Sequence, residues 1–136
     1  MPQSPTADPP SAGRVTRVYA TPDGVSHFAE IEVALADAGP IGRLSEPVAA
    51  LGVVFRETPA DYDFDWHPAP QRQLIVLLDG HIEIEAGDGE KRLFGGGDVL
   101  LVEDTEGRGH RTRTTDGRSR RSLFIPLPPD AFPLAP

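Results

Sequence analysis

Two histidines and a glutamine between residues 66 and 110 are the side chains of this chain best suited to chemistry. His67 is followed six residues later by Gln73, and His110 comes directly after a Gly-Arg-Gly sequence. Imidazole nitrogens and a side-chain carbonyl can hold a divalent metal. An imidazole also titrates near neutral pH, so it can act as a general acid or base without a metal. We therefore treat His67 and His110 as candidate catalytic residues and all three as candidate metal ligands.

Strand periodicity decides whether these side chains can share one space. Residues 71–78 (QRQLIVLL) are apolar on both faces, which is typical of a strand buried between two sheets. Side chains two apart point the same way, and His67 has the same parity as this strand's inward set. That set comprises Gln71, Gln73, Ile75 and Leu77. On the second element, His110 aligns with Thr112, so the pattern predicts one interior pocket.

The rest of the chain predicts many short strands and no helix. Glycine and proline occupy 14 and 15 of the 136 positions, which suits an all-β fold with frequent turns. Alternating or apolar runs predict strands over 14–21, 27–36, 49–58, 71–78, 81–86, 91–94, 99–103, 110–114 and 122–126. Residues 39–47 and the acidic, aromatic segment 59–65 are expected to be connections. A sandwich or jelly roll of antiparallel strands accommodates such a pattern.

The length of 136 residues favours one domain. We expect residues 1–13, which are rich in Pro, Ser and Ala, to be disordered. Residues 14–126 form the predicted barrel, and residues 127–136 are a proline-rich tail. The first 13 residues lack the apolar core of a signal peptide, and no apolar run approaches the roughly 20 residues that cross a bilayer. A cytoplasmic protein without a membrane partner is therefore expected.

The net charge of −8 argues against a nucleic-acid partner, since binding a polyanion depends on neutralising phosphates. Residues 108–121 are a local exception with six arginines. This segment could be an anion or RNA patch. It could also be two solvated strands around the Asp116-Gly117 turn, and the lack of interleaved aromatic residues favours this second interpretation. The absence of cysteine excludes disulfides and thiolate chemistry.

The order of these residues resembles the motifs of the cupin superfamily of small β-barrels. In this comparison His67 matches the first histidine, Gln73 the Glu or Gln that follows, and Gly80 the closing glycine. Gly97-Asp98 matches the opening of the second motif, and His110 matches its final histidine. The matched segment covers about a third of the chain. The resemblance implies a cupin-type jelly-roll β-barrel that forms a homodimer and binds a small organic molecule inside the barrel.

The resemblance also implies a divalent metal (Fe, Mn, Zn or Ni) held by His67, Gln73 and His110. Two departures leave open whether any metal binds. Ala69 replaces the second histidine of the first motif, and Glu103-Asp104-Thr105 replaces the usual Pro-x-Gly before the last histidine. Without a metal, the two histidines remain candidates for direct acid–base chemistry.

The residues around the histidines predict a partly apolar ligand with a polar head. The candidate substrate-binding residues are Phe55, Trp66, Gln71, Ile75, Leu77 and Thr112, with Val99 or Leu101 as further wall residues. We expect an enzyme of the isomerase, lyase, cyclase or oxygenase type that acts on a small organic metabolite. The alternative is a ligand-binding cupin without catalytic activity.

Other charged and aromatic residues have structural interpretations. His27 and His81 lie beside turns and are expected at the surface. The aromatic side chains of residues 61–66 could form the lip of the pocket, with a carboxylate as a general base. The favoured interpretation is an acidic loop whose aromatic side chains cap the barrel end. One carboxylate of Glu103 or Asp104 is expected to pair with Arg108 and order the loop before His110.

Overall fold

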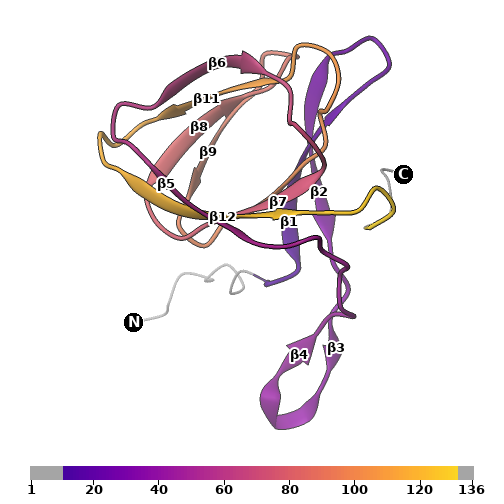
Figure 1. Cartoon of the computed structure of the whole chain (residues 1–136). Coiled ribbons are helices and arrows are strands. Elements are labelled where there is room, and N and C mark those ends of the chain that lie inside the picture. The colour runs from indigo at the N-terminus through magenta and orange to yellow at the C-terminus, as the bar shows by residue number, and fades with distance from the viewer. Residues whose placement is uncertain (1–10, 132–136) are drawn as a thin grey trace, which may run out of the picture.

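The computed structural model describes residues 11–131, which form strands and one short 3₁₀ turn but no α-helix (Figure 1). The strands are β1 (Arg14–Ala20), β2 (Ser26–Glu32), β3 (Ala36–Asp37), β4 (Arg43–Leu44), β5 (Val54–Thr58), β6 (Asp63–His67), β7 (Gln73–Leu77), β8 (His81–Glu85), β9 (Lys91–Gly95), β10 (Val99–Val102), β11 (His110–Thr114) and β12 (Arg120–Pro126). The 3₁₀ turn, Gly39–Ile41, joins β3 to β4. Over this part of the chain, no helix has the length and hydrophobicity needed to cross a membrane.

Two sheets face each other and enclose the interior (Figure 1). The larger has the strand order β2-β1-β10-β7-β12-β5, and the smaller has the order β6-β11-β8-β9. All neighbouring strands run antiparallel except β1 and β10, which pair in parallel. Alternation explains the burial pattern of the smaller sheet. In β8, Ile82 and Ile84 are buried, whereas His81 at the start of the strand is exposed. The expected all-β fold of antiparallel strands is confirmed, with the β1–β10 pair as the exception.

The larger sheet has a core on each face. Inside, between the two sheets, a cluster includes Val18, Ile84, Leu100 and Val102. On the outer face, Leu101 packs in a second cluster with three other buried residues, Val15, Leu127 and Ala131. The strands of this sheet are therefore apolar on both faces because both faces are covered.

Several expected boundaries were wrong. Residues 63–65, the end of the expected connection 59–65, belong to strand β6, because its alternating residues find a partner in β11. The strand expected over 49–58 begins only at Val54, and the strand expected over 27–36 ends at Glu32. The expected loop 39–47 lies mostly in the β3–β4 hairpin, which extends away from the body (Figure 1).

At both ends of the expected barrel, adjoining residues contact the folded body. Residues 11–13 belong to the folded part, since the backbone N–H of Val33 donates to the carbonyl of Gly13 at 2.7 Å. The rest of the segment expected to be disordered, 1–10, lies outside the described residues. The start of the tail is packed: Leu127 and Ala131 are buried, and Arg72 Nη1 donates to the carbonyl of Ala131 at 2.6 Å.

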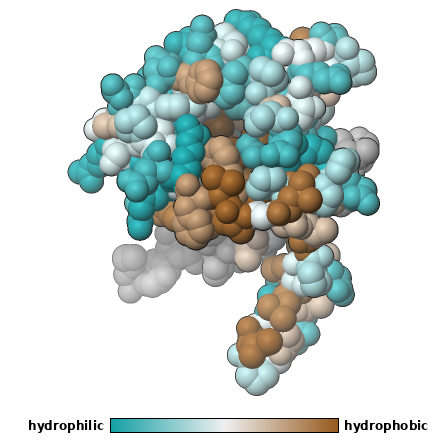
Figure 2. All heavy atoms as spheres, viewed as in Figure 1, coloured by the Kyte–Doolittle hydropathy of each residue, from teal (hydrophilic) through white to brown (hydrophobic). Residues whose placement is uncertain are grey.

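Exposed apolar side chains gather on the hairpin and on the segment that leads into β5. They are Ile41, Leu44, Leu51, Val53, Val54 and Phe55. Figure 2 shows hydrophobic side chains on the projecting hairpin and on the adjoining part of the body, whereas the opposite end of the body is mainly hydrophilic. The molecule thus has one distinctly apolar side.

Candidate functional site

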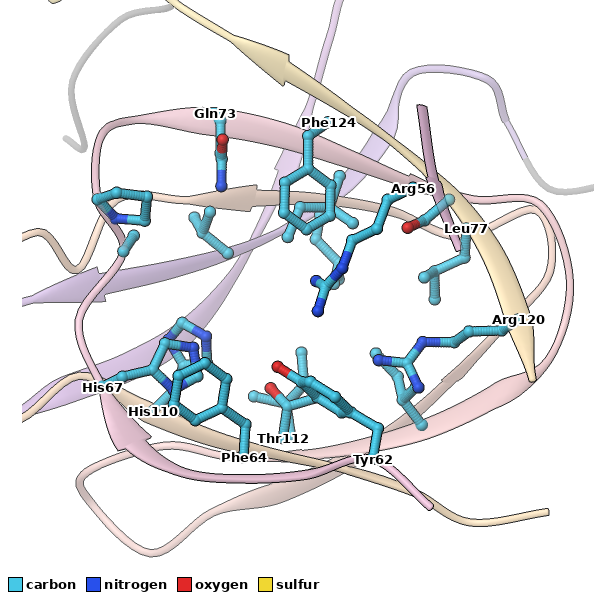
Figure 3. A pocket seen from close by; sticks show the side chains of 18 residues that line it. Arg56, Tyr62, Phe64, His67, Gln73, Leu77, His110, Thr112, Arg120 and Phe124 are labelled. Carbon is cyan, nitrogen blue, oxygen red and sulfur yellow. The ribbon is translucent and has the colours of Figure 1, made fainter. Parts of the chain in front are cut away.

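A cavity of about 230 Å³ lies between the two sheets and is lined by residues of both. Its walls are mostly aliphatic and aromatic. Its polar lining residues are Arg56, Tyr62, His67, Gln73, His110, Thr112, Arg120 and Ser122. Figure 3 shows the two histidines together at one end of the cavity and the two arginines away from them. A mostly apolar cavity with a few convergent polar groups is the usual form of a small-molecule site.

His67 and His110 are direct neighbours across β6 and β11, where they occupy paired positions. Their ring centroids are 4.6 Å apart, and the ring planes are inclined by 57°. Gly109 permits this approach, because a Cβ at that position would overlap the carbonyl of His67, and its φ of +80° favours glycine. The structure therefore brings both candidate catalytic residues to one point of the cavity wall.

His110 forms a buried pair with Asp104. Its Nδ1 lies 2.6 Å from Asp104 Oδ2, and the aspartate is completely buried. An ionised carboxylate only accepts hydrogen bonds, so Nδ1 of His110 donates to Oδ2 and Nε2 is left for other partners. The second oxygen, Asp104 Oδ1, has no hydrogen-bond partner among the described residues. Among the described residues, the side-chain carboxylate of Asp104 is thus hydrogen-bonded through Oδ2 to the imidazole of His110.

His67 is held by its own strand and by an aromatic neighbour. Its Nδ1 lies 2.8 Å from the carbonyl oxygen of Asp65, to which it donates. The Phe64 ring stacks on the imidazole with centroids 4.0 Å apart. Burial lowers the pKa of His67 below its usual 6.5, and the neighbouring His110 adds to this effect. His67 is therefore neutral at pH 7, with its Nε2 free to accept a proton or hydrogen bond.

Four other expected site residues also line the cavity. Gln73, Ile75 and Leu77 come from β7, and Thr112 comes from β11. Figure 3 places Gln73 on the wall opposite the two histidines. The amide side chain of Gln73 is buried, with 5% exposure.

Three expected substrate-binding residues lie outside the cavity. Phe55 is 82% exposed, because Arg56 and not Phe55 occupies the inward position of β5. Trp66 alternates with the inward His67, and its ring instead stacks under the Arg108 guanidinium at 3.8 Å. Gln71 is exposed, since β7 and its regular alternation begin only at Gln73.

Other expectations near the site also need correction. Leu100 and Val102 line the cavity, where Val99 or Leu101 was expected, because the alternation of β10 directs Val99 and Leu101 to the outer cluster. Neither carboxylate of the Glu103-Asp104 pair binds Arg108. Glu103 pairs with the buried side chains of Arg17 and, at 2.7 Å, Arg72. Residues 61–66 do not form a capping loop, since β6 contains most of them.

The candidate site residues chosen from the sequence did not include Asp104, Tyr62, Arg56 or Arg120. Arg120 lies in the arginine-rich segment that was interpreted as solvated, yet it is only 4% exposed and lines the cavity. Arg56 is followed directly by the charged Glu57, so the charges along β5 do not indicate which side chain faces inward. Other arginines of the segment are indeed solvated and paired, such as Arg113 with Glu83 at 2.9 Å.

The remaining two histidines belong to surface pairs. His27 Nδ1 lies 3.0 Å from Asp88, and the more exposed His81 lies 3.0 Å from Asp116. Neither lines the cavity.

No protein-family model matches the chain, and no curated protein is significantly similar to it. Similar solved structures include the cupin domain of Schizosaccharomyces pombe Cnp3, with 13% identity, a TM-score of 0.45 and 85% of each chain covered. Another is protein NMB1881 from Neisseria meningitidis, with 20% identity, a TM-score of 0.44, and 61% of this chain and 81% of that chain covered. A third is the polyketide cyclase RemF from Streptomyces resistomycificus, with 22% identity, a TM-score of 0.43 and 58% of each chain covered.

The decisive observation for the fold is the arrangement of the strands described above: two facing, mainly antiparallel sheets with a cavity between them that holds the motif histidines. The fold is an all-β arrangement of two facing sheets. The motif positions His67, Gln73 and His110 all reach the cavity.

Proposed function

We propose that this cupin-like chain is an enzyme that binds a small, partly apolar organic molecule in the cavity and moves a proton on it. The reaction class is that of an isomerase, lyase or cyclase. The observation that carries the proposal is the Asp104–His110 pair, with 2.6 Å between Oδ2 and Nδ1, at the wall of a mostly apolar cavity.

The pair has the parts of a general base. Nε2 of His110 accepts a proton from a C–H or O–H bond of the substrate, and the electron pair of that bond stays on the substrate. The buried Asp104 carboxylate stabilises the resulting imidazolium and fixes its orientation. Returning the proton to another atom completes an isomerisation, and loss of a leaving group completes an elimination.

His67 supplies a second, neutral imidazole beside the first. Its ring lies 4.6 Å from that of His110, and burial keeps its pKa low. A neutral neighbour does not repel the protonated His110, so it does not oppose the step. Its Nε2 can accept a hydrogen bond from the substrate and hold the reacting atom near His110.

The residues do not fit a tightly bound divalent metal. The expected ligands supply two neutral imidazoles and one neutral amide, and Gln73 lies on the opposite wall (Figure 3). Within residues 11–131, no three His, Cys, Asp or Glu side chains are grouped as metal ligands. The nearest carboxylate, Asp104, is engaged with Nδ1 of His110. A bound metal and oxygenase chemistry therefore stay predictions of the family resemblance. The proposed proton transfer uses His67, His110 and Asp104.

Base-catalysed ring opening of nitrobenzisoxazole tests the proposal without knowledge of the natural substrate. In this reaction a base removes one C–H proton, the N–O bond breaks, and a coloured cyanonitrophenolate forms. We expect the wild-type protein to react faster than imidazole at the same concentration. His110→Gln should remove this excess rate, whereas the surface variant His81→Gln should keep it.

Two results would contradict the proposed enzyme. One is a wild-type rate no higher than that of free imidazole. The other is a His110→Gln variant as active as the wild type. In either case a ligand bound in the cavity would point to the alternative function, a non-catalytic binding protein.

We also propose that the chain forms a homodimer through its apolar side. The β3–β4 hairpin has no buried residue of its own and projects from the body, while its Ile41 is 73% exposed. Beside it, β5 is an edge strand of the larger sheet and carries the exposed Phe55. A second copy that covers this side would bury both surfaces and the open strand edge at once.

A further inference from the structure

We propose that Arg56 and Arg120 form a carboxylate-binding site at the end of the cavity away from the histidines. The molecule on which His110 acts is then a small organic acid with a flat, apolar body. This inference rests on the proposed function for the role of His110, but the binding site itself can be tested separately.

Arg120 is a buried cation with little inside the protein to bind. Only 4% of the residue is exposed, and its Nη1 donates to the hydroxyl of Thr114 at 2.8 Å. A guanidinium has five N–H donors, and the others have no acceptor among the described residues. Figure 3 shows the side chain reaching into the cavity.

Arg56 enters the same cavity from the neighbouring strand β5 (Figure 3). Both guanidiniums lie near one aromatic ring: Arg56 Cζ is 5.1 Å and Arg120 Cζ is 5.0 Å from the centroid of Tyr62. Arg56 Cζ is also 5.1 Å from the Phe124 ring. In the described part of the chain, neither arginine has a carboxylate within 4.0 Å.

This lack of a carboxylate is notable in an acidic chain. The net charge is −8, and the other buried arginines are paired: Arg17 and Arg72 share the carboxylate of Glu103. Two unpaired guanidiniums in one cavity repel each other and lose hydration. Burial, and then the charge of Arg56, lower the pKa of Arg120. A bound anion would relieve both costs, because a carboxylate accepts several charge-assisted hydrogen bonds.

The cavity limits what else the ligand can contain. Its volume of about 230 Å³ is below the roughly 300–1,000 Å³ typical of sites for drug-sized molecules. Between the arginines and the histidines the walls are apolar, with Ile75, Leu77 and Phe124 among them. One carboxylate, a single ring or short unsaturated body, and a reactive C–H or O–H at the far end match this layout.

Binding of cinnamate and of its neutral isostere cinnamamide, measured by calorimetry, tests the site. We expect cinnamate to bind at least about tenfold more tightly than the amide, as charge-assisted hydrogen bonds imply. Arg56→Gln and Arg120→Gln should each weaken cinnamate binding by a similar factor and leave cinnamamide binding nearly unchanged. The control is Arg121→Gln, which changes an exposed neighbour paired with Asp79 and should bind cinnamate as the wild type does.

Equal affinity for acid and amide would overturn the proposal, as would full cinnamate binding by both arginine variants. Binding of phenyl phosphate in place of cinnamate would overturn the substrate class. Arg56 is only half-buried, so its variant keeps the test decisive if Arg120→Gln fails to fold. His110→Gln should still bind cinnamate. Cinnamate binding therefore tests the arginine site. Proton removal from the neutral nitrobenzisoxazole tests the proposed function separately.

Discussion

The carboxylate of Asp104 and the imidazole of His110 are joined across the loop that connects β10 to β11, with 2.6 Å between Oδ2 and Nδ1. Asp104 is also tied by its backbone, whose carbonyl accepts from Ala69 N–H at 3.0 Å. The aspartate is therefore fixed on two sides and can hold the ring of His110 in one orientation. Each proposal for proton transfer in this cavity depends on that relationship.

Asp104→Asn should lower the rate of nitrobenzisoxazole ring opening by at least about tenfold, because the amide cannot stabilise an imidazolium. The backbone bond to Ala69 does not depend on the side chain, so the fold should persist. Rates and thermal melts of the variant are the measurements. Asp116→Asn, which alters the equivalent surface pair with His81, is the control and should leave the rate unchanged. An unaltered rate in Asp104→Asn would remove the carboxylate from the mechanism.

Glu103→Ala should destabilise the protein by about 3–5 kcal/mol, since it leaves two buried arginines without their shared carboxylate. The Glu103 side chain is only 5% exposed and binds both Arg17 and Arg72. The matched control is Glu32→Ala, which breaks an exposed pair with Arg14 and should cost about 0–1 kcal/mol. Urea denaturation of both variants gives the two free energies. Similar small losses would show that the Glu103 network is not a stabilising element.

Leu77→Ala should cost about 2–5 kcal/mol, because it removes a buried side chain between the two sheets. The adjacent residue is a direct control: Leu78 is 44% exposed, whereas Leu77 is 2% exposed. Leu78→Ala should therefore lose much less stability. Thermal and denaturant unfolding can be compared for the pair, and equal losses would mean that the cavity closes around the missing side chain.

The strands could be predicted from the sequence where alternation or apolar runs were clear, as at Ile82 and Ile84. The approach of His67 to His110 also followed from parity and motif order. The inward residue of β5 could not be predicted, since local sequence does not reveal whether Phe55 or Arg56 faces the cavity of an edge strand. The hydrogen-bond partner of His110 could not be predicted either. The path of a glycine-containing loop decides that Asp104 and not Glu103 reaches the ring.

The stability of the protein should depend on pH through His67. Burial lowers its pKa in the folded chain below 6.5, so the unfolded chain binds the proton more readily. The free energy of unfolding should therefore fall as the pH drops from about 6.5 towards the folded pKa, and stay level above that window. Denaturation of wild type and His67→Gln is measured between about pH 5 and 8. The contributions of other titrating groups cancel in the difference between the two free energies of unfolding. Parallel curves would contradict the shift.

Phe55→Asp should convert the proposed dimer into a monomer, because it places a charge in the apolar surface that the second copy would cover. Phe55 is 82% exposed, so the isolated chain should keep its melting behaviour. Leu93→Asp changes a residue that is 72% exposed on β9, in the other sheet, and serves as the control. Molar mass from light scattering distinguishes the two. A wild type that is already monomeric would overturn the dimer.

The parallel pairing of β1 with β10 also affects how the chain folds during synthesis. Thr16 is opposite Leu100, so β1 waits for a strand made some 80 residues later. Until the ribosome has released β10, the β1–β2 hairpin lacks the neighbour that completes its sheet. Such non-local pairing slows folding and leaves apolar strands exposed in the meantime. The nascent chain should therefore be a client for chaperones until β10 has been made.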